Sequence, residues 1–144
     1  MNLKEIQEEI IAEFEIYDNW MDKYNFLIEL SKTLLPFDDK YKKPENLIKG
    51  CQSRVWLNAE LEGDKVIFIA DSDAIITKGI IALLIRVLSG RTTDEIMNAD
   101  LFFIDKIGLK ENLSPTRSNG LSSMVKQMKL YALAYHTKLN KEKL

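Results

Sequence analysis

The sequence predicts an α+β domain in which helices pack on one face of a small antiparallel β-sheet. Apolar residues recur at helical spacing near the N-terminus, alternate at strand spacing in the middle, and return to helical spacing towards the C-terminus. Strands gathered into one run between helices are typical of an α+β arrangement. The chain has 144 residues, a usual size for one hydrophobic core. We therefore expect a single domain over residues 1–144.

The N-terminal part is predicted to form two helices. Apolar residues between Leu3 and Phe14 follow helical spacing, with acidic residues between them. Asn19 is suited to cap the second helix, with Asp22 in its first turn. Pro36 ends this helix, because proline disfavours helical geometry in the residue before it. The polar segment 37–45 then predicts a loop.

The middle of the chain is predicted to form a β-hairpin. Apolar and polar residues alternate from Arg54 to Leu61, and a second β-rich run covers Val66–Ala70. Gly63 and Asp64 supply the turn between them. A short strand at Asn46–Ile48 is expected to add a third member to the sheet.

An aliphatic stretch, Ala74–Leu88, follows the hairpin and is too long for one strand. It predicts a largely buried helix that Asp73 caps and that stops near Gly90. Thr92 and Glu95 have the spacing of a capping box, which predicts a short helix.

The last part of the chain is predicted to be helical as well. Ala99–Ile107 is expected to form a short helix that ends at Gly108. Apolar residues between Leu121 and Tyr135 recur at helical spacing and predict a long C-terminal helix, with Ser118 as its cap.

Composition excludes several classes of protein. Apolar residues make up 46% of the chain and charged residues 29%, and the net charge of −2 gives no sign of a nucleic-acid-binding domain. The single cysteine excludes an internal disulfide and argues against a cysteine-rich metal site. The first 18 residues carry one lysine and six acidic residues, unlike a targeting segment, so we expect a cytoplasmic protein.

Cys51 is the first candidate for chemistry, because it lies where a loop meets a strand. Gly50 permits unusual backbone angles, and Lys49 and Arg54 lie on either side. Nearby cations are expected to lower the thiol pKa and favour the nucleophilic thiolate. The alternative is a buried structural cysteine, and the sequence leaves both open. His136 is the one histidine that could act as its base, but neighbouring lysines indicate a solvated helix end.

Two further segments carry candidate residues. Arg117 precedes the long helix, where it could bind an anion, approach a thiolate or contact a partner; the alternative is a surface arginine in a capping loop. Asp71 and Asp73 invite a metal site, but one short motif lacks further oxygen ligands. The end of a hairpin followed by a helix cap explains these two carboxylates better.

Four stretches together make the chain resemble the SufE family of sulfur-acceptor proteins. The most specific is Gly50-Cys51-Gln52-Ser53 followed by Val55-Trp56-Leu57. The others run from Trp20 to Leu30, from Ala70 to Thr92 and from Leu113 to Leu121. The resemblance implies the small sheet with packed helices that this family shares with IscU-type scaffolds. The chain lacks the three cysteines of such scaffolds, so we expect no metal.

The resemblance also implies a function. Cys51 corresponds to the family's acceptor cysteine, which takes sulfur as a persulfide from a PLP-dependent cysteine desulfurase and stimulates that enzyme. The sulfur then passes to the SufBCD scaffold for iron–sulfur cluster assembly. Arg117 falls on an arginine near the cysteine loop and the desulfurase interface, and Gln52 and Ser53 belong to the loop motif. PLP stays on the partner, so the chain itself is expected to need no cofactor.

The sequence leaves two points open. The related CsdE branch shares the motif, so the desulfurase is either SufS-like or CsdA-like. The chain is expected not to be a stand-alone enzyme, and it could instead be a non-catalytic module that activates a desulfurase allosterically, with Cys51 merely packed at the interface.

Overall fold

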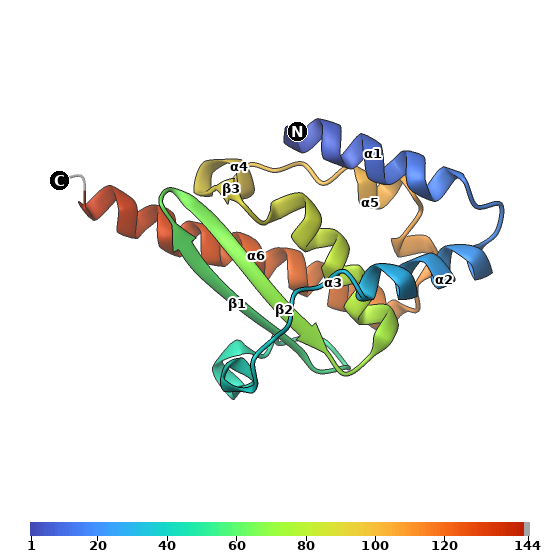
Figure 1. Cartoon of the computed structure of the whole chain (residues 1–144), viewed down its shortest axis with the longest axis horizontal. Coiled ribbons are helices and arrows are strands. Elements are labelled where there is room, and N and C mark those ends of the chain that lie inside the picture. Colours follow the sequence, from blue (N-terminus) through green and yellow to red (C-terminus); the bar gives the residue numbers. More distant parts are fainter. Residues whose placement is uncertain (143–144) are drawn as a thin grey trace.

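A computed structural model describes residues 1–142 and shows a hairpin-based sheet with helices around it (Figure 1). In chain order the elements are α1 (Leu3–Glu15), α2 (Trp20–Ser31), η1 (Asp39–Tyr41), η2 (Pro44–Asn46), β1 (Val55–Glu62), β2 (Lys65–Ser72), α3 (Ile75–Leu88), β3 (Arg91–Thr92), α4 (Thr93–Met97), α5 (Phe103–Lys106), η3 (Lys110–Asn112) and α6 (Pro115–Glu142). Among these described residues, no helix is long and apolar enough to cross a membrane.

The sheet is antiparallel, with strand order β1-β2-β3. Its hairpin pairs Val55 with Ser72 at one end and Glu62 with Lys65 at the other. Alternate side chains on both long strands are buried on one face, as the strand period requires. Helices α3 and α6 lie along this sheet (Figure 1), and Phe68 of β2 packs edge-on against Tyr131 of α6. The predicted α+β class and its helix-covered sheet are confirmed.

The predicted third strand at Asn46–Ile48 is wrong. Pro44 instead begins the 3₁₀ turn η2, and the buried Asn46 side chain donates to the carbonyl of Tyr41. Among the described residues, this segment contributes to the sheet only through an isolated β-bridge between Leu47 and Trp56. The third strand is β3, which pairs with the start of β2.

The two helix caps predicted at Asn19 and Thr92 are confirmed, and the cap predicted at Asp73 is wrong. Asn19 accepts from the backbone of Asp22, and Thr92 forms the capping box with Glu95. Asp73 does not cap α3, because Ala74 occupies the cap position. The Asp73 carboxylate accepts instead from the backbone N–H of Arg54, at 3.0 Å, across the end of the hairpin.

The last two helices differ from prediction in where they begin. The predicted helix Ala99–Ile107 shortens to α5, because the buried Gln7 side chain binds the backbone of both Asp100 and Phe103 and takes the intervening residues out of helical geometry. Helix α6 begins at Pro115, since proline suits the first position of a helix. Ser118 is therefore inside the helix, and its hydroxyl donates to the carbonyl of Lys110.

Side chains of α6 also cover the outer edge of β1. The hydroxyls of Tyr131 and Tyr135 donate to the carbonyls of Leu57 and Ala59, at 3.5 and 2.6 Å. These carbonyls would otherwise form part of an unpaired strand edge. The contacts fix α6 against the hairpin, and thereby fix the position of the loop that leads into β1.

Candidate functional site

Cys51 lies in the loop that enters β1, and Gly50 determines how closely that loop approaches α6. Gly50 has a φ of +90°, in the region that side-chain-bearing residues rarely adopt. A Cβ at this position would lie 2.5 Å from the Oγ of Ser123 on α6. The positive φ requires glycine, and a Cβ would also force the Ser123 side chain to move, so Gly50 determines where Cys51 lies.

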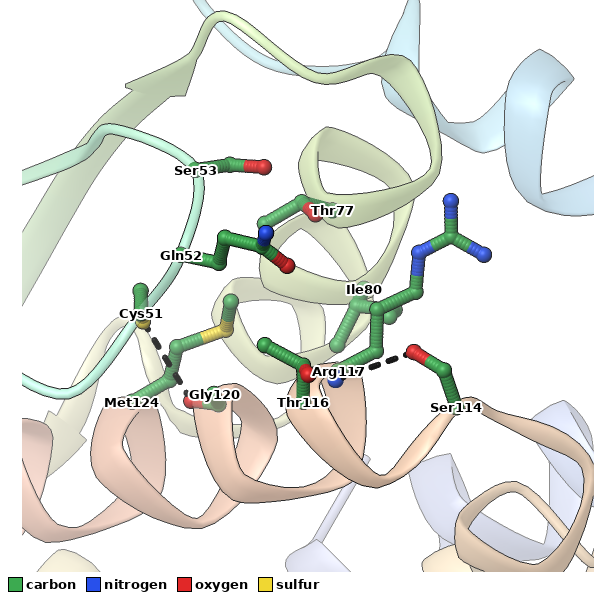
Figure 2. A pocket seen from close by; sticks show the side chains of 10 residues that line it. All are labelled: Cys51, Gln52, Ser53, Thr77, Ile80, Ser114, Thr116, Arg117, Gly120 and Met124. Atoms are coloured by element: carbon green, nitrogen blue, oxygen red, sulfur yellow. Dashed lines mark hydrogen bonds between the residues drawn. The ribbon is translucent and has the colours of Figure 1, made fainter.

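The thiol of Cys51 is half-buried and turned inwards against the first turns of α6 (Figure 2). Its Sγ donates to the carbonyl of Gly120 at 3.6 Å. A Cβ on Gly120 would lie 3.5 Å from the same sulfur, which is ordinary van der Waals contact. The loop therefore rests on α6 through sulfur and backbone contacts.

Burial raises the pKa of the Cys51 thiol, and the expected lowering by neighbouring cations is wrong. Lys49 lies in a separate groove with Ser123 and Lys126. Arg54 is exposed, and the hydrogen bond it makes to Asp73 uses its backbone. In this inward position the thiol is held mainly in its neutral form.

A cavity of about 260 Å³ opens beside the thiol (Figure 2). It is lined by loop residues Cys51, Gln52 and Ser53, by α3 residues Thr77 and Ile80, and by Ser114, Thr116, Arg117, Gly120 and Met124 at the start of α6. Cys51 and Arg117 lie on opposite sides of this cavity, and the guanidinium extends away from the sulfur (Figure 2). The structure thus places Cys51, Gln52, Ser53 and Arg117 around one cavity.

Thr77 is the lining residue that sequence reasoning missed. It lies within the aliphatic helix α3, and the residue is only 6% exposed. One signal was present in the sequence, because Thr77 and Lys78 together interrupt the apolar residues at the start of this helix. Its role becomes visible only when the hairpin and α6 bring the cavity walls together.

The other candidate residues lie away from the thiol. His136 faces α4, where its ring contacts the hydroxyl of Thr93 and the carboxylate of Asp94. Asp71 pairs with Lys42 and Lys78. Burial acts to raise the pKa of its carboxyl, but a hydrogen bond from the Ser72 backbone and the two cations outweigh it and hold that pKa below its ordinary value. The described residues contain no cluster of three or more potential metal ligands.

We expect the alkylation of Cys51 by iodoacetamide to have a pH midpoint above the ordinary thiol value of about 8.5. Burial disfavours the thiolate, and the thiolate is the reacting form. Since the folded pKa exceeds the unfolded one, the thiol favours folding below about pH 8.5, and this contribution is lost as pH rises through the folded pKa. The same chain in denaturant is the control. A folded midpoint at or below the denatured one would contradict the inward position.

Gly50→Ala is expected to free the Cys51 loop from α6. A left-handed alanine costs about 1–2 kcal/mol, and its Cβ also meets Ser123. A free-energy change of that size corresponds to about a 5- to 30-fold gain in the population of open loop conformations. The rate of Cys51 alkylation at constant pH measures it. Gly90→Ala is the matched control, because Gly90 has a φ of +80° and open space around it. An unchanged rate in Gly50→Ala would show that the loop does not depend on this glycine.

Comparisons with known proteins agree with the architecture. The chain resembles a solved structure, a hypothetical protein from Thermus thermophilus, with a TM-score of 0.73 at 20% identity, covering 92% of this chain and 96% of the other. That likeness concerns the fold alone.

Sequence comparisons identify the family. A family model described as SufE, Fe-S metabolism associated domain, matches residues 8–132. An uncharacterised SufE-like protein of Rhizobium etli is 43% identical, covering 85% of this chain and 86% of that protein. SufE-like protein 1 of Arabidopsis thaliana, designated chloroplastic/mitochondrial, is 39% identical, covering 91% of this chain and 36% of its own length. The chain therefore belongs to the SufE family of proteins associated with Fe–S metabolism.

Proposed function

We propose that the chain accepts sulfur on Cys51, as a persulfide, from a PLP-dependent cysteine desulfurase. The observation that carries this proposal is the placement of the single thiol at the edge of an open cavity, on a loop that glycine holds against α6. Membership of a family associated with Fe–S metabolism supports it. Lys49, Gly50, Gln52, Ser53, Arg54 and Arg117 are proposed as supporting or partner-binding residues.

The transfer is a thiol–persulfide exchange. The Cys51 thiolate attacks the outer sulfur of the desulfurase persulfide and forms a new S–S bond. The old S–S bond breaks, and its electron pair leaves with the desulfurase cysteine as a thiolate. No external oxidant or reductant is required, and PLP acts on the partner, so the chain supplies only the accepting sulfur.

The inward position of the thiol requires the loop to turn outwards during transfer. In the resting chain, half-burial and a raised pKa keep Cys51 from the oxidation that exposed thiolates undergo. Docking on the desulfurase would exchange the contact with Gly120 for contacts with the partner. The loop thus reconciles protection of the thiol with access to it.

We further propose that the loaded chain delivers its sulfur to the SufBCD scaffold in the cytoplasm and stimulates its desulfurase. The desulfurase is SufS-like or CsdA-like. Pull-downs with each candidate enzyme distinguish the two.

Mass mapping after incubation with desulfurase and cysteine tests the proposal. The expected result is a gain of one sulfur atom on Cys51 that dithiothreitol removes. Desulfurase heated to inactivity is the control. Absence of added sulfur on Cys51 with every desulfurase that binds the chain would overturn the proposal.

The packed position of Cys51 against Gly120 favours one alternative, a non-catalytic module that activates the desulfurase. Cysteine turnover measured with Cys51→Ala separates the two. Full stimulation by this variant, with no persulfide on the wild-type chain, supports the module. If Cys51→Ala no longer stimulates cysteine turnover by the desulfurase, the result supports the sulfur-carrier function.

A further inference from the structure

The cavity beside Cys51 has the chemistry of an anion site. Apart from the thiol, its polar lining consists of hydroxyls, one amide and the guanidinium of Arg117, with no carboxylate among the described residues that line it. Within residues 1–142, Arg117 forms no ion pair. A lining with one cation, several hydroxyl donors and no carboxylate favours the binding of a negatively charged ligand.

Thr77 is the observation that points to a ligand. The residue is more than nine-tenths buried and lines the cavity. Helical threonines often donate to a carbonyl one turn earlier, but the Thr77 hydroxyl makes no such bond among the described residues. Every fully buried side-chain polar atom there has a partner, so this hydroxyl is one that remains accessible from the cavity. The hydroxyl is therefore available to donate to a molecule in the cavity. Thr77 also lies in the first turn of α3, where helix geometry favours negative charge.

The cavity therefore has two ends with different chemistry. Figure 2 shows the thiol of Cys51 and the residue Met124 at one side and Arg117 with Ser114 at the other, with Thr77 on the wall that α3 forms. One sulfur atom added to Cys51 would occupy only the first end. A ligand that fits both ends has a transferable sulfur joined to an anionic head.

We propose that this cavity binds a small anionic sulfane-sulfur donor, with thiosulfate as the simplest case, and that Cys51 takes sulfur from it without a desulfurase. Thr77 donates to the oxyanion head, the Arg117 guanidinium turns inwards from the position it has in Figure 2 to pair with that head, and the sulfane sulfur faces the thiol. The inference rests on the proposed function in one respect, namely that Cys51 is the sulfur-carrying atom. The loop stays inward for this reaction, in contrast to docking on a protein donor.

The step balances without a further reagent. The Cys51 thiolate attacks the sulfane sulfur of thiosulfate and forms a persulfide S–S bond. The S–S bond of thiosulfate breaks, and sulfite leaves with the electron pair. The positive charge of Arg117 and the hydroxyl of Thr77 stabilise the departing sulfite. A proton lost from the thiol passes to the solvent.

The experiment incubates the purified full chain with thiosulfate alone and follows sulfite release together with the mass of Cys51. The expected result is saturable sulfur uptake that sulfate, an oxyanion with no transferable sulfur, inhibits competitively. Thr77→Val keeps the side-chain shape, and loss of one hydrogen bond to a charged group is expected to raise the half-saturating concentration about tenfold. Arg117→Met is expected to raise it further. Thr137→Val is the matched control, since Thr137 lies on the exposed part of α6.

The outcomes are separable. Uptake that is linear in thiosulfate, insensitive to sulfate and equal in Thr77→Val would overturn the site. If Thr77→Val fails to fold, sulfate competition in the wild-type chain decides alone. A second series measures sulfur uptake from free cysteine persulfide, whose anionic group is a carboxylate. Comparing it with thiosulfate shows which anionic group of the donor the cavity prefers. Uptake from thiosulfate but from no desulfurase would support this inference and overturn the proposed function, and the reverse would overturn this inference alone.

Discussion

Replacing Cys51 by serine is expected to abolish sulfur acceptance completely and to leave the fold intact. Serine cannot form a persulfide, and the described chain has no second cysteine to take its place. The fold should survive because the thiol is half-buried at the edge of a cavity rather than in the core. The serine hydroxyl can also donate to the carbonyl of Gly120, as the thiol does.

A displaced thiol makes this test sharper. Ser122 is exposed on α6, only two residues beyond Gly120. The double variant Cys51→Ser with Ser122→Cys therefore restores a cysteine on the same helix but at a different cavity, which Leu101 and Val125 also line. Intact mass after incubation with desulfurase and cysteine is expected to show no added sulfur on either variant. Sulfur on the serine variant would refute Cys51 as the acceptor, and efficient loading of the displaced thiol would show that loop position is unimportant.

Local sequence rules predicted the parts of this fold that short-range forces determine. The hairpin follows from alternation on either side of Gly63, and the caps at Asn19 and Thr92 depend on residues three positions away. Cys51 was also identifiable, because its loop motif is contiguous. In each case the interacting groups are near neighbours along the chain.

Features that depend on distant contacts were missed or misassigned. Asp73 is a sound helix cap by composition, but the backbone of Arg54 provides a competing donor from the other strand of the hairpin. Gln7 shortens α5 from the opposite end of the sequence. The pKa of Cys51 is raised because packing against α6 excludes water. The sequence showed only the neighbouring cations Lys49 and Arg54, which predicted a lowered pKa. Tertiary contacts override local preference at all three places.

Gly79→Ala is expected to lower the free energy of unfolding more than alanine at the hairpin turn does. A Cβ at Gly79 would lie 2.2 Å from the carbonyl oxygen of Leu27 and 2.8 Å from its carbonyl carbon. These are backbone atoms of α2, so no side-chain rotation relieves the clash, and α2 must move away from α3. Overpacking typically costs about 1–3 kcal/mol, and we expect about 3 kcal/mol for this change. The gain of about 1 kcal/mol in helix propensity that alanine brings is too small to offset it.

Urea unfolding measures this loss, with Gly63→Ala as the control. Gly63 has a φ of +67° in the hairpin turn and nothing near its missing Cβ, so alanine there costs about 1–2 kcal/mol of backbone strain alone. Equal or greater stability in Gly79→Ala would mean that the two helices separate freely. The change should also reach the site, because Thr77 and Ile80 on either side of Gly79 form one wall of the cavity beside Cys51. A displaced α3 would alter that wall, so the folded Gly79→Ala chain should also change in its rate of Cys51 alkylation, whereas Gly63→Ala should not.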